Sequence, residues 1–443
     1  MKEFFSNDVL LHSQCAKVLY EGVKDLPIID YHCHLDEKMI AADRRFFDIG
    51  ALWLESDHYK FRAMRLMGID EKYITGDATY QEKFRKYASV MPALCANPLY
   101  YFSHMELSQI FGITKPLSEE NADEIFVAAN AVLANMKVSD ILEKFNVEYI
   151  ATTDDPCSPL SHHGQYGVTK VCPTFRPDRF LRPSKALISE LTAASGKDIK
   201  CLDSYVCALE DRLDYFITKG CGISDHGMDF LPLAECPTEY ARELFERCES
   251  LTENEADTLS SYLLYKLART YSKRGIVMQI HFGTFRRVNT EMTKRLGADM
   301  GFDVMRSSCD IDRLAIFFDT LDADDALPRT VLYSLNPQFT TAAATLSGAF
   351  PGVLIGAAWW FNDTLAGIKK NLEIIAEYAA LGSSLGMLTD SRSFASYVRF
   401  DFFRRILADF VGEKVECGEY CMEHAEKLMY DVCYGNVKKL LKI

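Results

Sequence analysis

The feature of this sequence that most constrains its fold is a repeated pattern, in which a short apolar run ends in polar, Gly or Pro residues and helical sequence follows. Short apolar runs that end in this way predict buried strands. Eight of them occur, at residues 26–30, 147–152, 171–175, 220–224, 276–280, 330–334, 353–360 and 385–388. They alternate with helical stretches such as 184–191, 241–274, 364–380 and 394–410. Eight strand–helix units predict a parallel sheet closed into a (β/α)8 barrel.

One stretch departs from this pattern. The chain between the first and the second predicted strand is far too long for a loop, and it is rich in helix formers and aromatic residues, as in YQEKFRKYASVM. We therefore interpret residues 36–139 as a helical insertion within one barrel domain that covers residues 1–443. Residues 417–443 are predicted to form a further helix at the C-terminus.

Charge and composition limit the partners that the protein can have. The formal net charge is −14, which argues against nucleic acid or an anionic membrane as the main partner. The 14 cysteines are scattered and form no CxxC pair, so we expect reduced thiols in a cytoplasmic protein. The uncharged stretch 331–362 is interrupted by Pro337 and Pro351, so we expect a buried part of the fold there and no membrane span.

Polar side chains follow most of the predicted strands. In a barrel of this type the carboxyl ends of the strands share one face, and active sites lie on that face. The following residues are therefore predicted to converge: His32, His34, Asp154, Arg176, His226, His281, Arg286, Asp390 and Arg392.

A metal site is predicted from the string IDYHCHL, which places two imidazoles just after the first strand. Because side chains alternate along a strand, His32 and His34 project to the same side, which suits two ligands of one divalent metal. Such a pair also occurs by chance. Asp390, after the last predicted strand, adds a carboxylate, and the three residues together indicate a metal site.

Three arginines stand at three strand ends: Arg176 in PTFRPD, Arg286 in HFGTFRR and Arg392 in TDSRS. One interpretation is that each pairs with a nearby aspartate, as most arginines do. The other is that they form a pocket for a carboxylate, since a guanidinium group binds a carboxylate through two parallel hydrogen bonds.

Longer strings carry a family resemblance. IDYHCHL, WLESDHYKFRAMR, PTFRPD, SDHG, QIHFGTFRRVNT, WWFND and MLTDSRSFASYVRFDFFRR together resemble the uronate isomerase family, also called glucuronate isomerase, a divergent branch of the amidohydrolase superfamily. The resemblance implies a distorted (β/α)8 barrel of the metal-dependent hydrolase type that holds one divalent metal, usually zinc. It also implies an aldose–ketose isomerase whose partners are small hexuronates. Such an enzyme converts D-glucuronate to D-fructuronate and D-galacturonate to D-tagaturonate.

The resemblance also implies roles for individual residues. His32, His34 and Asp390 match the family's metal ligands, and His281 matches its histidine at the fifth strand. The catalytic candidates are Asp390, Arg392, Tyr59 and His281, and the candidates for substrate binding are Arg176, Arg286, His226, Trp360 and His58. For His226, a role in orienting a metal ligand is an equal alternative. The sixth predicted strand ends in YSLNP without a histidine, which argues against a second metal.

The reaction implied by this resemblance moves a proton from C2 to C1 of an open-chain uronate through an enediol. It needs a base, stabilisation of an oxyanion and a group that binds the carboxylate. Asp390 is placed to assist ring opening, and on chemical grounds we favour Tyr59 or a metal-bound water over Arg392 as the base. A mononuclear metal-dependent hydrolase and a non-catalytic barrel that binds acidic sugars are the alternatives. We also expect a homo-oligomer.

Overall fold

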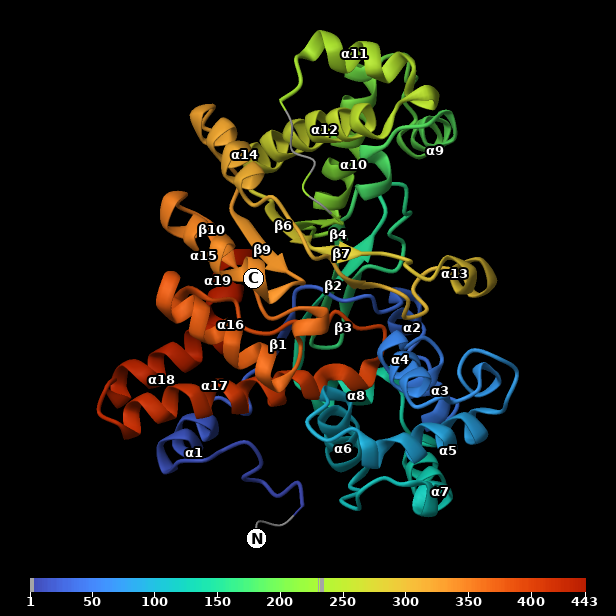
Figure 1. Ribbon diagram of the computed structural model, residues 1–443, viewed down its shortest axis with the longest axis vertical. Coiled ribbons are helices and arrows are strands. Elements are labelled where there is room, and N and C mark those ends of the chain that lie inside the picture. The colour runs from blue at the N-terminus through green and yellow to red at the C-terminus, as the bar shows by residue number, and fades with distance from the viewer. Residues whose placement is uncertain (1–3, 230, 232–234) are drawn as a thin grey trace.

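The computed structural model describes residues 4–229, 231 and 235–443 (Figure 1). Its centre is a curled sheet in which parallel strands follow the order β1-β2-β4-β5-β6-β9-β10. These strands are β1 Ile28–Asp30, β2 Val147–Asp154, β4 Thr169–Phe175, β5 Ile223–Met228, β6 Val277–Phe282, β9 Thr330–Ser334 and β10 Val353–Ile355. The order of the strands along the chain is also their order in space, as a barrel requires. This architecture confirms the predicted fold class, a distorted (β/α)8 barrel.

The eighth predicted strand is absent as a regular strand from the described part of the chain. Residues 385–388 run as irregular chain between β10 and β1. Gly386 has a positive φ of 69°, and a Cβ at this position would lie 2.3 Å from the carbonyl oxygen of Val432. The gap is instead closed by Thr389, whose backbone N and Oγ1 donate to the two carboxylate oxygens of Asp30 at 2.9 and 2.6 Å. This side chain of β1 adds to two backbone hydrogen bonds just beyond it, from Asp390 N to the carbonyl oxygen of His32 at 3.1 Å and from His34 N to that of Ser391 at 2.9 Å.

Helices surround this sheet. The chain begins with α1 Gln14–Glu21, and the helices between β4 and the C-terminus are α9 Lys185–Ser195, α10 Leu202–Thr218, α11 Thr238–Glu246, α12 Glu253–Arg274, α13 Thr290–Leu296, α14 Asp312–Ala323, α15 Thr340–Ala349, α16 Leu365–Tyr378, α17 Val398–Glu416, α18 Met422–Tyr430 and α19 Asn436–Leu441. A π-helical turn, Asp431–Gly435, joins α18 to α19. Two short pairings are additional to the expected pattern: β3 Gly164–Tyr166 pairs antiparallel with β4, and β7 Thr284–Phe285 pairs with β8 Val304–Met305.

The chain between β1 and β2 is helical: α2 Glu37–Ala41, α3 Ile49–Leu54, α4 His58–Leu66, α5 Tyr80–Val90, α6 Pro98–Phe111, α7 Ala122–Leu133 and α8 Val138–Lys144. Helices α3 to α5 and α7 lie together to one side of the sheet, at the lower right of Figure 1. Together with α6 they form a second hydrophobic core that includes Trp53, Phe84, Tyr87 and Leu107. The division into one barrel domain with an insertion at residues 36–139 stays a prediction.

The alternation of side chains along the strands decides which residues reach the barrel interior. On β6, Val277 belongs to the interior cluster, whereas Met278, Ile280 and Phe282 pack into the core shared with the surrounding helices. The same interior cluster includes Ile223 of β5. Side chains an even number of positions further along the same strand project to the same side. Asp225, two residues after Ile223, and His281, four residues after Val277, therefore project into the barrel.

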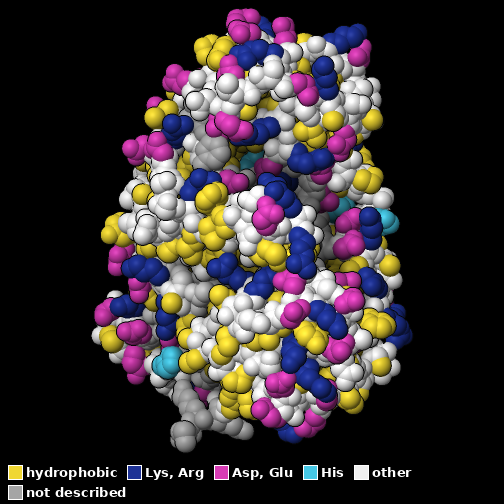
Figure 2. All heavy atoms as spheres, turned by 45° about the vertical axis from the view of Figure 1, so that its right-hand side comes forward, with side chains coloured by type: hydrophobic (Ala, Val, Ile, Leu, Met, Phe, Trp, Pro, Cys, Tyr) yellow, Lys and Arg dark blue, Asp and Glu magenta, His cyan; other side chains and the backbone are white. Residues whose placement is uncertain are grey.

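No described helix has the length and apolar character needed to cross a membrane. The cysteines are all free thiols in the structure. Basic and acidic side chains are interspersed over the face shown in Figure 2, which has no large area of one sign of charge.

Candidate functional site

The predicted metal ligands come together at the carboxyl end of the sheet. His32 and His34 follow β1, and Asp390 follows the irregular segment that replaces the eighth strand. Nε2 of His32 and Nε2 of His34 each lie 3.3 Å from Oδ1 of Asp390. Two atoms bound to one zinc ion at tetrahedral angles stand roughly 3.4 Å apart. The three side chains therefore fit one small divalent cation.

The protonation states of His34 and Asp390 agree with metal binding. Burial is outweighed at His32, where Asp225 and Asp390 raise the pKa, so that a metal would compete with a proton there. Burial lowers the pKa of His34 to about 4, although Asp390 acts in the opposite direction, so this imidazole is neutral at pH 7. Burial alone would raise the pKa of Asp390, but the hydrogen bonds from His32 and His34 hold it well below its usual value. A neutral imidazole and an ionised carboxylate are the forms that bind metals. Asp390 also has a positive φ of 46°, a conformation that costs free energy and is found at functional sites.

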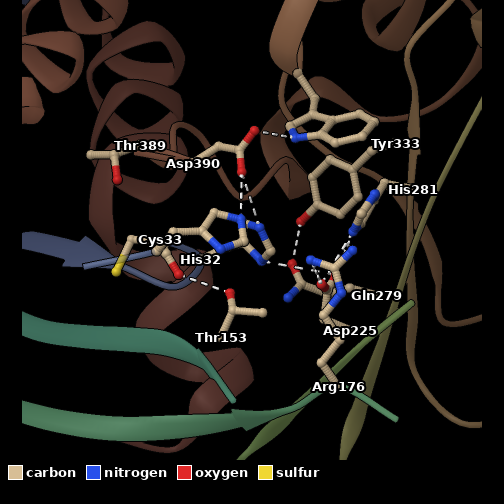
Figure 3. Close-up of polar contacts among 12 residues, drawn as sticks. His32, Cys33, Thr153, Arg176, Asp225, Gln279, His281, Tyr333, Thr389 and Asp390 are labelled. Carbon is tan, nitrogen blue, oxygen red and sulfur yellow. Dashed lines mark hydrogen bonds and ion pairs between the residues drawn. The ribbon is translucent and has the colours of Figure 1, made fainter. Parts of the chain in front are cut away.

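Asp225 of β5 is a member of the site that the sequence did not single out (Figure 3). Its Oδ1 lies 3.0 Å from Nε2 of His281 and 3.9 Å from Nδ1 of His32, and its Oδ2 lies 3.3 Å from Nη1 of Arg176. His32, Asp225 and His281 also lie close enough to hold a metal. Arg176 already compensates the charge of Asp225, however, so Asp225 is better placed to orient His32 and His281.

His226 is the residue that the structure does not bring to this group. It is fully buried, its ring lies 5.7 Å from that of Tyr271 on α12, and its Nδ1 lies 3.6 Å from Oδ1 of Asp178. The reason is the strand alternation: Asp225 projects inward, so its neighbour on a regular strand projects outward. Counting two residues from the apolar Ile223 would have identified Asp225. A substrate contact of His226 stays a prediction without support from this geometry.

The three predicted arginines all lie at the same end of the barrel, and each has a carboxylate partner. Nε of Arg176 lies 2.9 Å from Asp178, Nε of Arg286 lies 2.8 Å from Asp229, and Nη2 of Arg392 lies 2.9 Å from Asp299. Each arginine is therefore paired with an aspartate, as the first interpretation predicts. Each side chain also keeps between 21% and 33% of its surface exposed, which is compatible with the second interpretation, a pocket for a carboxylate. A carboxylate of a substrate could reach them.

Aromatic side chains form one wall of the site. The ring of His58 stacks on that of Tyr59 at 4.8 Å and meets the ring of Trp360 at 5.4 Å. The guanidinium of Arg286 lies 5.6 Å from the centre of the Trp360 ring. The hydroxyl of Tyr59 is buried and has no hydrogen-bond partner among the described residues. Burial and the charge of Asp390 raise the pKa of Tyr59 well above its usual value, so the phenol keeps its proton at neutral pH.

Trp359 contacts the site as well as Trp360, although two neighbouring residues on a regular strand would project to opposite faces. Its Nε1 donates a hydrogen bond of 2.6 Å to Oδ2 of Asp390, and its ring lies 4.4 Å from that of His281. The alternation rule does not apply here, because β10 ends at Ile355 and Trp360 has a positive φ of 51°.

Of the other predicted residues, Asp154 accepts a hydrogen bond from Thr152 at 2.7 Å.

A cavity of about 340 Å³ opens beside this group. Its lining includes His34 and Arg392, together with Arg44, Phe46 and Tyr80. The space is larger than a single sugar acid requires, and its mix of arginines and aromatic rings suits a polar ligand with apolar faces.

Comparisons with known proteins agree with this architecture. A model of the glucuronate isomerase family matches residues 1–441. The chain is 41% identical to the uronate isomerase of Caldicellulosiruptor saccharolyticus, over 99% of both chains. The solved uronate isomerase of Thermotoga maritima has a TM-score of 0.96 and 33% identity, covering 99% of this chain and 100% of its own. The glucuronate isomerase of Caulobacter crescentus has a TM-score of 0.93 and 29% identity, covering 99% and 97%. The chain therefore belongs to the uronate isomerase family.

Proposed function

We propose that this protein is a metal-dependent uronate isomerase that interconverts D-glucuronate with D-fructuronate and D-galacturonate with D-tagaturonate. The observation that carries this proposal is that Nε2 of His32 and Nε2 of His34 each lie 3.3 Å from Oδ1 of Asp390, beside Arg392, in a chain whose residues 1–441 match this family. An arginine-lined metal site suits a substrate that carries both a carboxylate and a carbonyl group. The family match supports an isomerase rather than a hydrolase.

The ligands proposed for the metal are His32, His34 and Asp390. A divalent cation held by this set, for which zinc is a good match, would withdraw electron density from the C1 carbonyl and stabilise negative charge on the oxygens of the enediolate. Asp225 orients His32 from the other side of its ring.

Binding of the substrate carboxylate is assigned to Arg176 and Arg286. Both guanidinium groups already bind a carboxylate through Nε, Arg176 that of Asp178 and Arg286 that of Asp229, and both keep other N–H donors. A uronate would join or displace these aspartates. Trp360 and His58 would provide the flat surface against which the carbon chain lies.

Proton transfer needs two movements, one from C2 to C1 and one from O2 to O1, so no co-reactant is consumed. Asp390 is ionised and can take the proton of the anomeric hydroxyl and deliver it to the ring oxygen. It is then ionised again. We assign the transfer of the C2 proton to C1 to the same carboxylate because of its position, since the lowered pKa keeps it ionised but also makes it a weak base. His281 has a lowered pKa, chiefly through burial, so it is neutral at pH 7 and can carry the proton from O2 to O1.

For Tyr59, which together with a metal-bound water is favoured as the base on chemical grounds from the sequence alone, we propose the role of a hydrogen-bond donor. Because its pKa is raised by burial and by Asp390, the phenol is a poor base and a good hydrogen-bond donor. We assign it to the oxyanion of the enediolate, where a donor is needed. Arg392 lies in the same small pocket as Tyr59 and Asp390 and adds positive charge there.

We further infer a cytoplasmic location, which the free thiols support, and a homo-oligomeric state, which is common among enzymes of this size.

Proton NMR tests the activity. Purified protein, metal-loaded or treated with a chelator, is incubated in D2O with D-glucuronate and separately with D-galacturonate. The ketose should form, and chelation should abolish its formation. If metal-loaded protein converts neither sugar, the proposal is wrong.

A further inference from the structure

Arg399 is a buried cation beneath the site whose role the family resemblance and the mechanism above leave unassigned. It is the second residue of α17, in the string YVRFDFFRR, and only 3% of its surface is exposed. Removing a guanidinium group from water is costly unless hydrogen bonds and opposite charges compensate it. The groups that contact the Arg399 guanidinium therefore indicate its role.

Arg399 contacts three segments of the chain that bear on the site, and in addition the ring of Phe102 on α6, whose centre lies 4.9 Å from the guanidinium carbon. Its Nη1 donates to the carbonyl oxygen of Thr389 at 2.7 Å and lies 3.1 Å from Oδ2 of Asp363. Its guanidinium carbon lies 5.4 Å from the centre of the Tyr59 ring. Both polar contacts use the same nitrogen, while the flat guanidinium also faces an aromatic ring, and a Lys ammonium lacks that flat face.

Each of the three segments supplies a group to the site. Thr389 directly precedes the metal ligand Asp390. Asp363 follows the 3-10 turn Trp360–Asn362, which carries the aromatic wall. Tyr59 lies on α4 of the helices between β1 and β2. One side chain therefore links three segments that are far apart in the sequence and that each contribute to the site.

The need for such a joint is greatest at Asp390. The eighth run does not form a strand. Among the described residues, only two backbone hydrogen bonds tie its polar end to the chain after β1, from Asp390 N to the carbonyl oxygen of His32 at 3.1 Å and from His34 N to that of Ser391 at 2.9 Å. Asp390 also has a positive φ that few residues adopt without support.

Thr389 is held on one side by Asp30 through its N and Oγ1, and on the other by Arg399 through its carbonyl oxygen. Without Arg399 the carbonyl group would lose its bond within a buried region.

We propose that Arg399 is a positioning residue, which sets the orientation of Asp390 toward the metal and the place of Tyr59 above the substrate without touching either the metal or the substrate. The effect on turnover rests on the proposed isomerase function. The effect on metal retention does not, because it concerns the ligand geometry alone.

Helix α17 supplies a matched control. Arg404 is also buried, with 4% of its surface exposed, and it also donates to backbone carbonyl groups, those of Lys24, Leu26 and Pro27. These carbonyl groups precede β1, at the end of the sheet opposite to the site. Arg404→Lys therefore makes the same change in the same helix and disturbs the same kind of bond far from Asp390.

The experiment compares Arg399→Lys, Arg404→Lys and the unchanged protein, each loaded with Zn²⁺. Release of zinc to an excess of a chromophoric chelator is followed over time, and kcat and KM are measured with D-glucuronate. We expect Arg399→Lys to release zinc about tenfold faster and to lose about tenfold or more in kcat, with KM changed less than about threefold. Arg404→Lys should match the unchanged protein within about twofold in all three.

Equal zinc release and equal kcat in the two variants would overturn the proposal, whatever their thermal stabilities. If the unchanged protein shows no isomerase activity, the zinc-release comparison still decides the matter. Asp363→Asn provides a second variant should Arg399→Lys fail to fold. It removes one of the two anchors of Arg399 and keeps the shape, and we expect it to speed zinc release by about threefold or more.

Discussion

The indole of Trp359 donates a hydrogen bond of 2.6 Å to Oδ2 of Asp390, while Oδ1 of the same carboxylate faces both His32 and His34. One aspartate thus presents one oxygen to the metal ligands and has the other fixed by an aromatic ring. The two contacts together fix the rotation of the carboxylate group. A contact to Oδ1 alone would leave the group free to rotate.

Replacement of Trp359 by Phe should therefore weaken metal binding. Phe keeps most of the ring packing against His281 and removes the N–H donor. We expect the zinc affinity to fall about tenfold, measured by competition with a chromophoric chelator. Trp53→Phe is the control, since Trp53 belongs to the core of the helices between β1 and β2. An unchanged affinity in Trp359→Phe would show that the hydrogen bond does not orient Asp390.

Asp225 and His226 are neighbours on β5 that face opposite sides of the sheet. Substitution of Asp225 should therefore mainly lower kcat, and substitution of His226 should mainly lower thermal stability. Asp225→Asn removes the charge that holds His281 and Arg176, and we expect kcat to fall by about 100-fold with little loss of fold. His226→Gln should lower the thermal stability and leave kcat within about threefold, because its ring packs on Tyr271. Steady-state kinetics and thermal unfolding of both variants check this. A larger loss of kcat in His226→Gln than in Asp225→Asn would reverse the assignment.

The ion pair of Arg286 with Asp229 should compete with the substrate. If Arg286 binds the uronate carboxylate, Asp229→Asn leaves the guanidinium without its internal anion, and KM should fall by about two- to threefold. Arg286→Met should raise KM by about tenfold or more, because a charged hydrogen bond contributes about 1.5–3 kcal/mol. Both constants come from initial rates with D-glucuronate. A rise of KM in Asp229→Asn would mean that the aspartate orients Arg286 rather than competing for it.

Acid should remove one stabilising contact at the N-terminal end of the chain. Burial alone would raise the pKa of Asp409, but Lys369 and His12 lower it below its usual value. A carboxylate whose pKa is lower in the folded state stabilises the fold above its unfolded pKa of about 3.9, and that stabilisation disappears as the pH falls through the folded value. Asp409→Asn should therefore reduce the free energy of unfolding by about 1 kcal/mol at pH 7, and by much less near pH 3.

Chemical denaturation of the two proteins at both pH values measures this difference. His424→Asn serves as the control, because its ring lies on α18 against the exposed Tyr420 and has no contact with Asp409 among the described residues. An equal loss of stability at pH 7 and pH 3 would show that Asp409 acts through packing and not through its charge.

Much of the fold follows from local sequence. Seven of the eight predicted strands form in the expected order, since an apolar run that ends in polar residues has few alternatives to a buried parallel strand. The eighth failed for a tertiary reason: Gly386 lies against the carbonyl group of Val432, and the segment is held by the side chains of Asp30 and Arg399. No local pattern contains these long-range contacts.

The sequence by itself determined the residue types at the strand ends, and with them the convergence of His32, His34 and Asp390, because the carboxyl ends of parallel strands meet on one face. Only the tertiary structure decided that Asp225 and not His226 enters the barrel, and that both tryptophans reach the site. It also decided that Tyr59 is a buried phenol which keeps its proton. The physical reason is that register, burial and charge neighbours arise from contacts between segments far apart in the chain, whereas residue type and periodicity are local.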